Sequence, residues 1–172
     1  MSISSLLKLV PPPATPKNPG SLPEWEKLTA KLGMALPQDY LEMCNAYGTG
    51  YFVSKGAGPI YVFNVFEPRA FRQLQQFRKA TALCREFSPG VIRDDEYVLN
   101  WAADTVSVNF SILLSEKSRQ SQLLLHNREM DAYRRYRMKM TDLLGRLFMG
   151  KLKTDFFKSS DFDGGVTFQQ RL

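Results

Sequence analysis

The stretch Leu36-Pro37-Gln38-Asp39-Tyr40 marks the start of a helix, and the elements around it can be worked out from there. Pro37 has no backbone N–H and holds φ near the helical value, so it suits the first position of a helix. Asp39 falls in the first turn, where the positive end of the helix dipole stabilises a carboxylate. Gly48 is expected to end the helix, because glycine adopts the left-handed conformation of helix C-termini without strain. The sequence therefore predicts a short helix over residues 37–47 with one apolar side.

A second amphipathic helix is predicted immediately before this stretch. Ser21 and Glu24 have the spacing of a capping box, in which each side chain accepts a hydrogen bond from the other residue's backbone N–H. Trp25, Leu28 and Leu32 then fall on one face of the helix. Two short helices therefore follow one another along the chain.

The remaining chain has patterns of strands and of further helices. Strands are expected at residues 51–53, 60–66, 97–101, 106–112 and 122–126, and longer helices at residues 70–87 and 129–149. Apolar and polar residues alternate strictly from Val106 to Ile112, which favours an antiparallel sheet with one buried and one solvated face. A polar turn at Ser115–Gln120 separates the last two strands. The fold class predicted is α+β: a single domain with an antiparallel β-sheet flanked by helices.

The chain divides into three parts by composition. Residues 1–20 are rich in proline and are expected to be extended on the surface. Residues 21–158 carry the helix and strand patterns of the α+β domain. Residues 159–172 begin with serine, aspartate and glycine and are expected to form a loosely held tail.

Cysteine content and hydropathy limit the cellular setting. Cys44 and Cys84 lie within helical patterns, and two cysteines in 172 residues indicate a reduced compartment rather than a disulfide framework. No run of 18 apolar residues and no signal-peptide pattern occurs in the sequence. We therefore expect a soluble, cytoplasmic protein that does not bind a membrane.

Residues suited to catalysis or metal binding are few. His126 is the only histidine, and no nucleophile motif accompanies it, so a strand-end histidine bonded to its neighbours is favoured over a general base. Asp94-Asp95-Glu96 falls in a predicted turn and is expected to be solvated rather than to hold a metal ion. Gly48-Thr49-Gly50 and Gly56-Ala57-Gly58 lack the pattern of a phosphate-binding loop and are interpreted as turns. The sequence predicts no enzyme activity, no cofactor and no metal site.

The surplus of basic residues offers the clearest functional hint. Formal net charge is +6 and the isoelectric point is about 9.4. The candidate partner-binding cations are Arg69, Arg72, Arg134, Arg135, Arg137, Lys139 and Arg146. They would form one positive field if the helices predicted at 70–87 and 129–149 were neighbours. Three interpretations remain open: an ordinary solvated surface, a site for an acidic protein partner, and a site for nucleic acid.

The order and spacing of the first elements resemble the opening pattern of the SUKH superfamily. The matching segments are Trp25-Glu26-Lys27-Leu28, Leu32-Gly33, Leu36-Pro37-Gln38-Asp39-Tyr40 and Tyr47-Gly48-Thr49-Gly50-Tyr51-Phe52. The resemblance covers roughly residues 20–155. The residues carried over from the family pattern are expected to be fold determinants: Trp25, Leu36, Pro37, Tyr40, Tyr47 and Gly48.

This resemblance implies a fold and a function. SUKH proteins are compact α+β domains with an antiparallel sheet, and most bacterial members are immunity proteins of polymorphic toxin systems. The expected function is thus non-catalytic: the protein would bind and neutralise a cognate protein toxin. A net charge of +6 fits a toxin with an acidic face better than a nuclease, whose inhibitors mimic acidic substrates. The alternative is a basic nucleic-acid-binding or regulatory scaffold domain.

Overall fold

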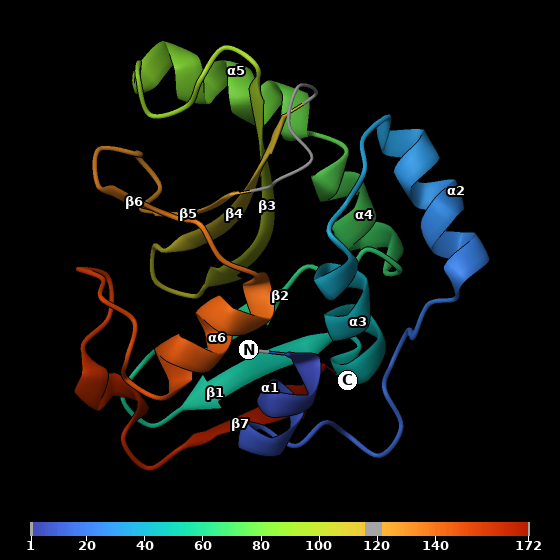
Figure 1. Cartoon of the computed structure of the whole chain (residues 1–172), viewed down its shortest axis with the longest axis vertical. Helices are drawn as coiled ribbons and strands as arrows, with labels where there is room; N and C mark the ends of the chain where they lie inside the picture. The colour runs from blue at the N-terminus through green and yellow to red at the C-terminus, as the bar shows by residue number, and fades with distance from the viewer. Residues whose placement is uncertain (1, 116–121, 172) are drawn as a thin grey trace.

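The computed structural model describes residues 2–115 and 122–171 (Figure 1). The helices are α1 (Ile3–Leu9), α2 (Leu22–Leu32), α3 (Gln38–Tyr47), α4 (Pro68–Leu74), α5 (Phe77–Phe87) and α6 (Met140–Phe148), with a 3-10 helix η1 (Ser159–Phe162). The strands are β1 (Gly50–Ser54), β2 (Ile60–Val62), β3 (Glu96–Asp104), β4 (Asn109–Ser115), β5 (Gln122–His126), β6 (Tyr133–Tyr136) and β7 (Val166–Gln170). Apart from Ser115, the predicted turn Ser115–Gln120 lies outside the described residues.

The strands form one antiparallel sheet in the order β6-β5-β4-β3-β2-β1-β7. Strands β6 and β7 are its two edges within the described chain. The predicted α+β domain with an antiparallel sheet flanked by helices is confirmed. The capping box of α2 is also present, with Ser21 N donating to Glu24 Oε2 at 2.8 Å.

The stretch around Pro37 starts a helix as predicted, one residue later than expected. Pro37 is the N-cap of α3 and keeps an extended ψ of 139°, so the helix proper begins at Gln38. Asp39 stabilises a second helix: its Oδ2 accepts a hydrogen bond from the backbone N–H of Met140 at 2.7 Å, at the start of α6. At the other end Gly48 has φ +70°. A Cβ there would lie 2.3 Å from the carbonyl oxygen of Lys17, so only glycine fits.

Aromatic side chains of α2, α3 and β1 form part of the core. Trp25 meets Tyr40 edge-on with ring centroids 6.1 Å apart, and Tyr47 meets Phe52 in the same way at 4.9 Å. Such edge-to-face contacts add stability beyond the burial of apolar area. The Tyr47 hydroxyl also donates to the carbonyl oxygen of Val10 at 2.7 Å, which holds the N-terminal segment against α3.

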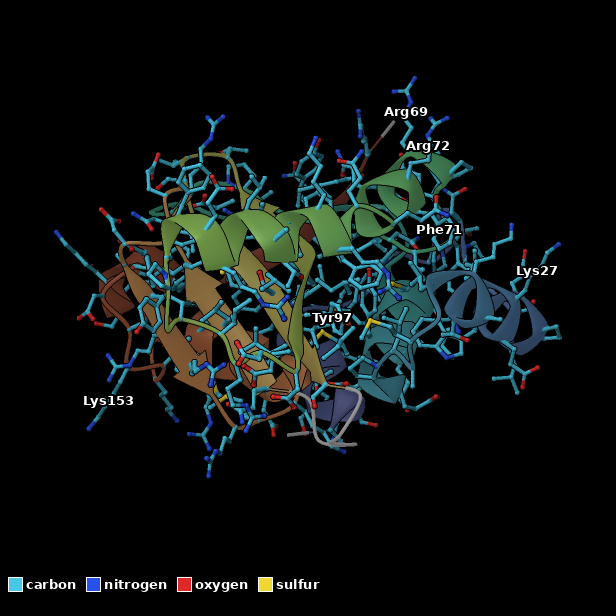
Figure 2. All side chains as sticks on the ribbon, turned by 90° about the horizontal axis from the view of Figure 1, so that it is seen from above. Lys27, Arg69, Phe71, Arg72, Tyr97 and Lys153 are labelled. Carbon is cyan, nitrogen blue, oxygen red and sulfur yellow. The ribbon has the colours of Figure 1, made fainter. Side chains whose placement is uncertain are left out.

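Both faces of the sheet are covered in its central part, contrary to the expectation of one solvated face. Helices α1, α3 and α6 pack together on one face, where Phe148 of α6 contacts Phe52 with ring centroids 5.0 Å apart. Helix α5 lies across strands of the other face, as Figure 2 shows. A separate apolar cluster there includes Cys84 of α5 with Leu113 and Leu124 of the sheet. Alternation along β4 therefore separates two buried faces.

The helix expected over residues 129–149 is wrong in its first half. Asn127 N donates to Ala132 O at 3.1 Å and Met130 takes φ +58°, which closes a turn. Strand β6 then pairs with β5, with Tyr133 opposite His126. Only Met140–Phe148 is helical. The apolar spacing of three and four residues suited a helix, but backbone pairing with β5 prevails.

Three other segments also differ from expectation. The helix predicted at 70–87 is interrupted at Gln75 and Gln76 between α4 and α5. The first residues are not all extended, because α1 forms and buries Leu6. Residues 159–172 are not loosely held as far as Arg171: η1 forms, and β7 pairs with β1 over five residues, from Gly50 opposite Gln170 to Ser54 opposite Val166.

Candidate functional site

The seven candidate cations fall into two groups on different elements, one running from β6 to α6 and one in α4. Arg134 and Arg135 are in β6, which is one edge. The group continues through the segment after β6 and into α6 with Arg137, Lys139 and Arg146. Arg69 and Arg72 are in α4 and line a pocket with Arg171, which directly follows the opposite edge strand β7. The structure therefore does not join the seven cations into one field.

Arg135 has a structural partner. Its guanidinium is ion-paired and hydrogen-bonded with Glu96, whose side chain is only 2% exposed. Arg93 contacts the same carboxylate at 3.1 Å and also donates its backbone N–H to Glu96 Oε2 at 2.8 Å. The expectation that Asp94-Asp95-Glu96 is a solvated cluster is thus wrong for Glu96. Arg135 holds a buried carboxylate and does not present a free charge.

The other cations of that group are exposed. Arg134 makes a long ion pair of 3.6 Å with Asp155, whose side chain is 94% exposed, so the pair adds little to stability. Arg137, Lys139 and Arg146 are also exposed. They are spread over β6, a connecting segment and α6, and none lines a pocket described for this structure.

A second group of cations surrounds a cavity of about 400 Å³, which we call the cationic pocket. Its lining residues are Lys17, Asn18, Thr49, Glu67, Pro68, Arg69, Arg72 and Arg171. Four of them are cations and one is a carboxylate. Figure 2 shows Arg69 and Arg72 projecting outward from α4. A concave surface with several cations raises the local concentration of anionic ligands.

The segment after α3, Gly48 and Thr49, positions one wall of this pocket. Lys17 pairs with Gly48 through a parallel β-bridge, and Thr49 N donates to Lys17 O at 3.0 Å. Asn18 Nδ2 donates to Thr49 Oγ1 at 3.1 Å. Buried Asn64 donates to Asn18 O at 3.0 Å and closes the network. Lys17 is thereby fixed at its backbone by Gly48 and Thr49.

The fourth cation of the cationic pocket is Arg171, which directly follows the C-terminal strand β7. Arg171 N donates to Thr49 O at 3.1 Å, and Lys17 Nζ donates to Arg171 O at 3.2 Å. The Arg171 guanidinium lies 5.7 Å from the ring centre of Tyr61, a cation–π contact. Hydrogen bonding to Tyr61 is the main cause that raises the pKa of Arg171. The one carboxylate is already engaged, because Glu67 accepts from the Tyr61 hydroxyl at 2.7 Å.

His126 is a buried residue at the end of β5 and is bonded to its neighbours, as the sequence indicated. Its Nδ1 donates to the carbonyl oxygen of Asn127 at 2.7 Å, and its Nε2 lies 2.9 Å from Ser111 Oγ. Burial lowers the pKa of the imidazole, because the charged form would lose its hydration. Ser111 in turn contacts Asn100 Oδ1 at 2.5 Å. His126 and Asn100, but not Ser111 between them, line a second cavity of about 640 Å³ beside α5.

No group of three or more histidine, cysteine, aspartate or glutamate side chains suited to a metal ion occurs within residues 2–115 and 122–171. Cys44 and Cys84 are separate buried thiols, and burial raises the pKa of Cys44 to about 12. A thiol so strongly protonated is a poor nucleophile at neutral pH. Gly56-Ala57-Gly58 lies in the bend between β1 and β2, as the sequence predicted, whereas Gly48-Thr49-Gly50 leads directly into β1, with Gly48 in a β-bridge to Lys17 and Gly50 as the first residue of the strand.

Comparison of the chain with protein-family models, curated proteins and solved structures gave no match. None of the helices in the described part of the chain combines the length and apolarity needed to cross a bilayer. Sequence reasoning found Arg69 and Arg72 but missed Lys17 and Arg171. Lys17 was hidden in a proline-rich segment and Arg171 in an expected tail, and no local spacing links either residue to α4.

Proposed function

We propose that this protein is a non-catalytic binding domain that captures an acidic protein partner, and that it is an immunity protein of the SUKH type acting on a cognate toxin. The observation that carries the proposal is the cationic pocket, where four cations from three distant parts of the chain converge around one engaged carboxylate. A protein that grips an acidic segment of a toxin needs such a preformed positive surface.

The resemblance supports the proposal through the way the pocket is built. Gly48 and Thr49 belong to the segment that resembles the family, and they fix the backbone of Lys17. The same pattern places Trp25 and Tyr40 in the core. Residues of the family-like pattern thus form the frame, and the surface around them carries the charge that would recognise one partner.

Binding would proceed in two steps. Arg69, Arg72 and Lys17 are exposed, so they act first through long-range attraction that speeds encounter with an acidic surface. Carboxylates of the partner then replace water in the pocket and form charge-assisted hydrogen bonds with the guanidinium groups. The backbone of one wall is already held by hydrogen bonds from Thr49 N to Lys17 O and from Arg171 N to Thr49 O, so binding orders the exposed side chains rather than this backbone.

The test is co-expression with the protein encoded beside this gene, followed by calorimetric titration and a growth-protection assay. Replacing Arg69 and Arg72 by Glu should weaken binding by about a hundredfold and abolish protection, because two attractions become repulsions. The matched control replaces Arg137 and Arg146 by Glu, which makes the same charge change on exposed residues away from the pocket, and should change affinity by less than about fivefold. No complex with the neighbouring protein, or equal losses in both variants, would refute the proposal.

A nucleic-acid-binding function is the second candidate. Its supporting observation is the pair Tyr51 and Tyr61, which lies beside Arg171 with ring centroids 5.1 Å apart and offers half-buried aromatic surface next to cations. A single-stranded oligonucleotide would then bind with an affinity that falls steeply with salt as counterions are released. Fluorescence anisotropy with a labelled 12-nucleotide DNA at two salt concentrations distinguishes this function from toxin binding.

A further inference from the structure

The two edges of the sheet differ in how they are protected against pairing with another strand. The edge strand β6 carries Arg134 and Arg135. The edge strand β7 has neither a charged residue nor a proline in its five positions, and Figure 1 shows it at the lower margin of the sheet, next to β1. Charges and prolines on an edge strand discourage the addition of a further strand. In the described part of the chain no strand pairs with the outer side of β7, so this edge is open.

The hydrogen bonds to β1 show which backbone groups of β7 point outward. Arg171 N donates to Thr49 O at 3.1 Å, and these two residues continue the register of the β1–β7 ladder as a hydrogen-bonded pair. Such pairs alternate along antiparallel strands, so the backbone groups of Gln169 and Thr167 also face β1. The position of Gly50 agrees, because a Cβ there would lie 2.3 Å from Gln169 O. Every second residue of β7 therefore turns its backbone groups away from the sheet.

The outward backbone groups belong to Val166, Phe168 and Gln170. Within residues 2–115 and 122–171, no backbone hydrogen bond from another segment reaches these groups. The strand that carries them is firmly held, because Phe168 packs against Tyr47 and Phe52 with ring centroids 5.0 and 5.1 Å apart. Each of the three residues thus offers one N–H and one C=O to an incoming strand on a preformed edge.

The two ends of the β7 edge differ in charge. Arg171 directly follows the strand and lines the cationic pocket, and Lys17 Nζ donates to its carbonyl oxygen at 3.2 Å. This end is therefore strongly positive. Near the first residues of the strand the charges are balanced, and they are those of Asp161, Asp163, Lys55 and Lys158. An incoming strand with acidic residues at one end would favour the orientation that places them at the cationic pocket.

We propose that β7 takes up an extended segment of the acidic protein partner as an added antiparallel strand, with acidic residues at the N-terminal end of that segment beside Lys17 and Arg171. This inference rests on the proposed function, because it names the part of the partner that reaches the cationic pocket. In strand addition, backbone hydrogen bonds to the edge supply affinity, and here the charges would fix direction and register. A second copy of β7 fits less well, since it has no charged residue to meet the pocket.

The test compares two synthetic peptides of identical composition with acetylated and amidated ends. The first has two glutamates followed by alternating threonine and valine, and the second has the same residues in reverse order. Hydrogen exchange of the ¹⁵N-labelled protein, followed by NMR, reports each backbone amide. In the free protein we expect the amides of Phe168 and Gln170 to exchange at least about tenfold faster than those of Thr167 and Gln169. The first peptide should slow exchange at Phe168 and Gln170 and bind about tenfold more tightly than the second, because only it places both glutamates at the cations.

Three results would overturn the proposal. The first is equal binding of the two peptides. The second is unchanged exchange at Phe168 and Gln170 at the highest peptide concentration. The third is protection of these amides in the free protein together with a dimer in sedimentation velocity, which would assign the edge to self-pairing.

A pair of variants tests whether the partner itself uses this edge. Gln170→Pro removes one outward N–H, and proline is tolerated on an edge strand where its missing N–H faces away from the sheet. Gln170→Val is the matched variant: it loses the same side-chain hydrogen bond to Thr15 O but keeps the N–H. In titrations with the protein encoded beside this gene, the proline variant should bind about tenfold more weakly than the valine variant.

These titrations separate strand addition from the proposed function. If replacing Arg69 and Arg72 by Glu weakens binding while the two Gln170 variants bind equally, strand addition is wrong and the proposed function stands. If the neighbouring protein does not bind at all, the proposed function fails and the two peptides still test the β7 edge. If the proline variant does not fold, the peptide comparison on the unmodified protein decides.

Discussion

Replacing Arg135 by Met should destabilise the fold strongly, although this residue was expected to contact a partner. Its guanidinium neutralises Glu96, whose side chain is 2% exposed, while Arg135 itself is 29% exposed. Methionine has a similar length and keeps much of the packing of the arginine stem, so the change mainly removes the charge and its hydrogen bonds. A buried carboxylate loses its principal partner.

The size of the stability loss depends on the contacts that Glu96 retains in the Arg135→Met variant. Removing one partner of a buried ion pair costs about 3–5 kcal/mol when the remaining charge is uncompensated. Arg93 still contacts Glu96 Oε1 at 3.1 Å and donates its backbone N–H to Oε2 at 2.8 Å. The expected loss is therefore at the lower end, about 3 kcal/mol. For a chain of 172 residues this corresponds to a fall in Tm of about 6–12 °C.

Urea unfolding followed by circular dichroism measures the loss, with the slope m checked for constancy. The matched control is Arg134→Met, the neighbouring residue in β6, whose exposed ion pair should be worth less than about 0.5 kcal/mol. Adding Glu96→Gln to Arg135→Met should restore most of the stability, because no buried charge then remains and the half-exposed Arg93 still faces Asp95 at 3.6 Å. The reasoning is refuted if the Arg135 and Arg134 variants lose equal stability, or if the double variant is less stable than Arg135→Met alone.

Three further predictions concern single residues. Gly48→Ala should lower the free energy of unfolding by about 2–4 kcal/mol in urea titrations, because φ is +70° and the new Cβ would lie 2.3 Å from Lys17 O; unchanged stability would contradict it. Asp39→Ala should cost about 1 kcal/mol and lower Tm by about 2–4 °C, because Met140 N loses its acceptor at the start of α6. The pKa of His126 is lowered in the folded state, so the unfolded chain binds the proton first as pH falls. Stability should be constant above about pH 7.5 and decline as pH falls through 6.5, by at most about 1.4 kcal/mol per pH unit, and His126→Gln should remove this slope because the chain has no other histidine.

Features determined by neighbours in the sequence were predicted well. The start of α3 at Pro37 and the capping box at Ser21 depend on backbone groups within four residues, and both occur nearly as expected. The function of Asp39 depends on a distant part of the chain. Its carboxylate bonds Met140, 101 residues further along, in addition to its place in the first turn of α3. No spacing within a helix reports such a contact.

Most of the candidate functional site could not be predicted from the sequence, because its residues also meet through contacts between distant parts of the chain. Lys17 and Arg171 are 154 residues apart and are joined through the pairing of β7 with β1. The segment carrying Arg171 contains serine, aspartate and glycine, which are typical of a tail, but its five-residue pairing with β1 overrides that composition. Arg135 was misassigned because a helix was expected at this point, and on a helix it would have faced solvent.

The polar residues of β4 explain why the prediction of a solvated sheet face was wrong. They also explain why a cavity remains between this face and α5. Alternation assigned Asn109 and Ser111 to a solvated face, yet Ser111 is completely buried beneath the α5 side of the sheet. A buried hydroxyl without a partner would be costly, and here His126 and Asn100 satisfy it. Apolar residues at these positions would let α5 pack directly on the strands, as Cys84 does on Leu113 and its neighbours. The polar row therefore keeps part of this face from closing, and a cavity persists where a fully apolar face would have been filled.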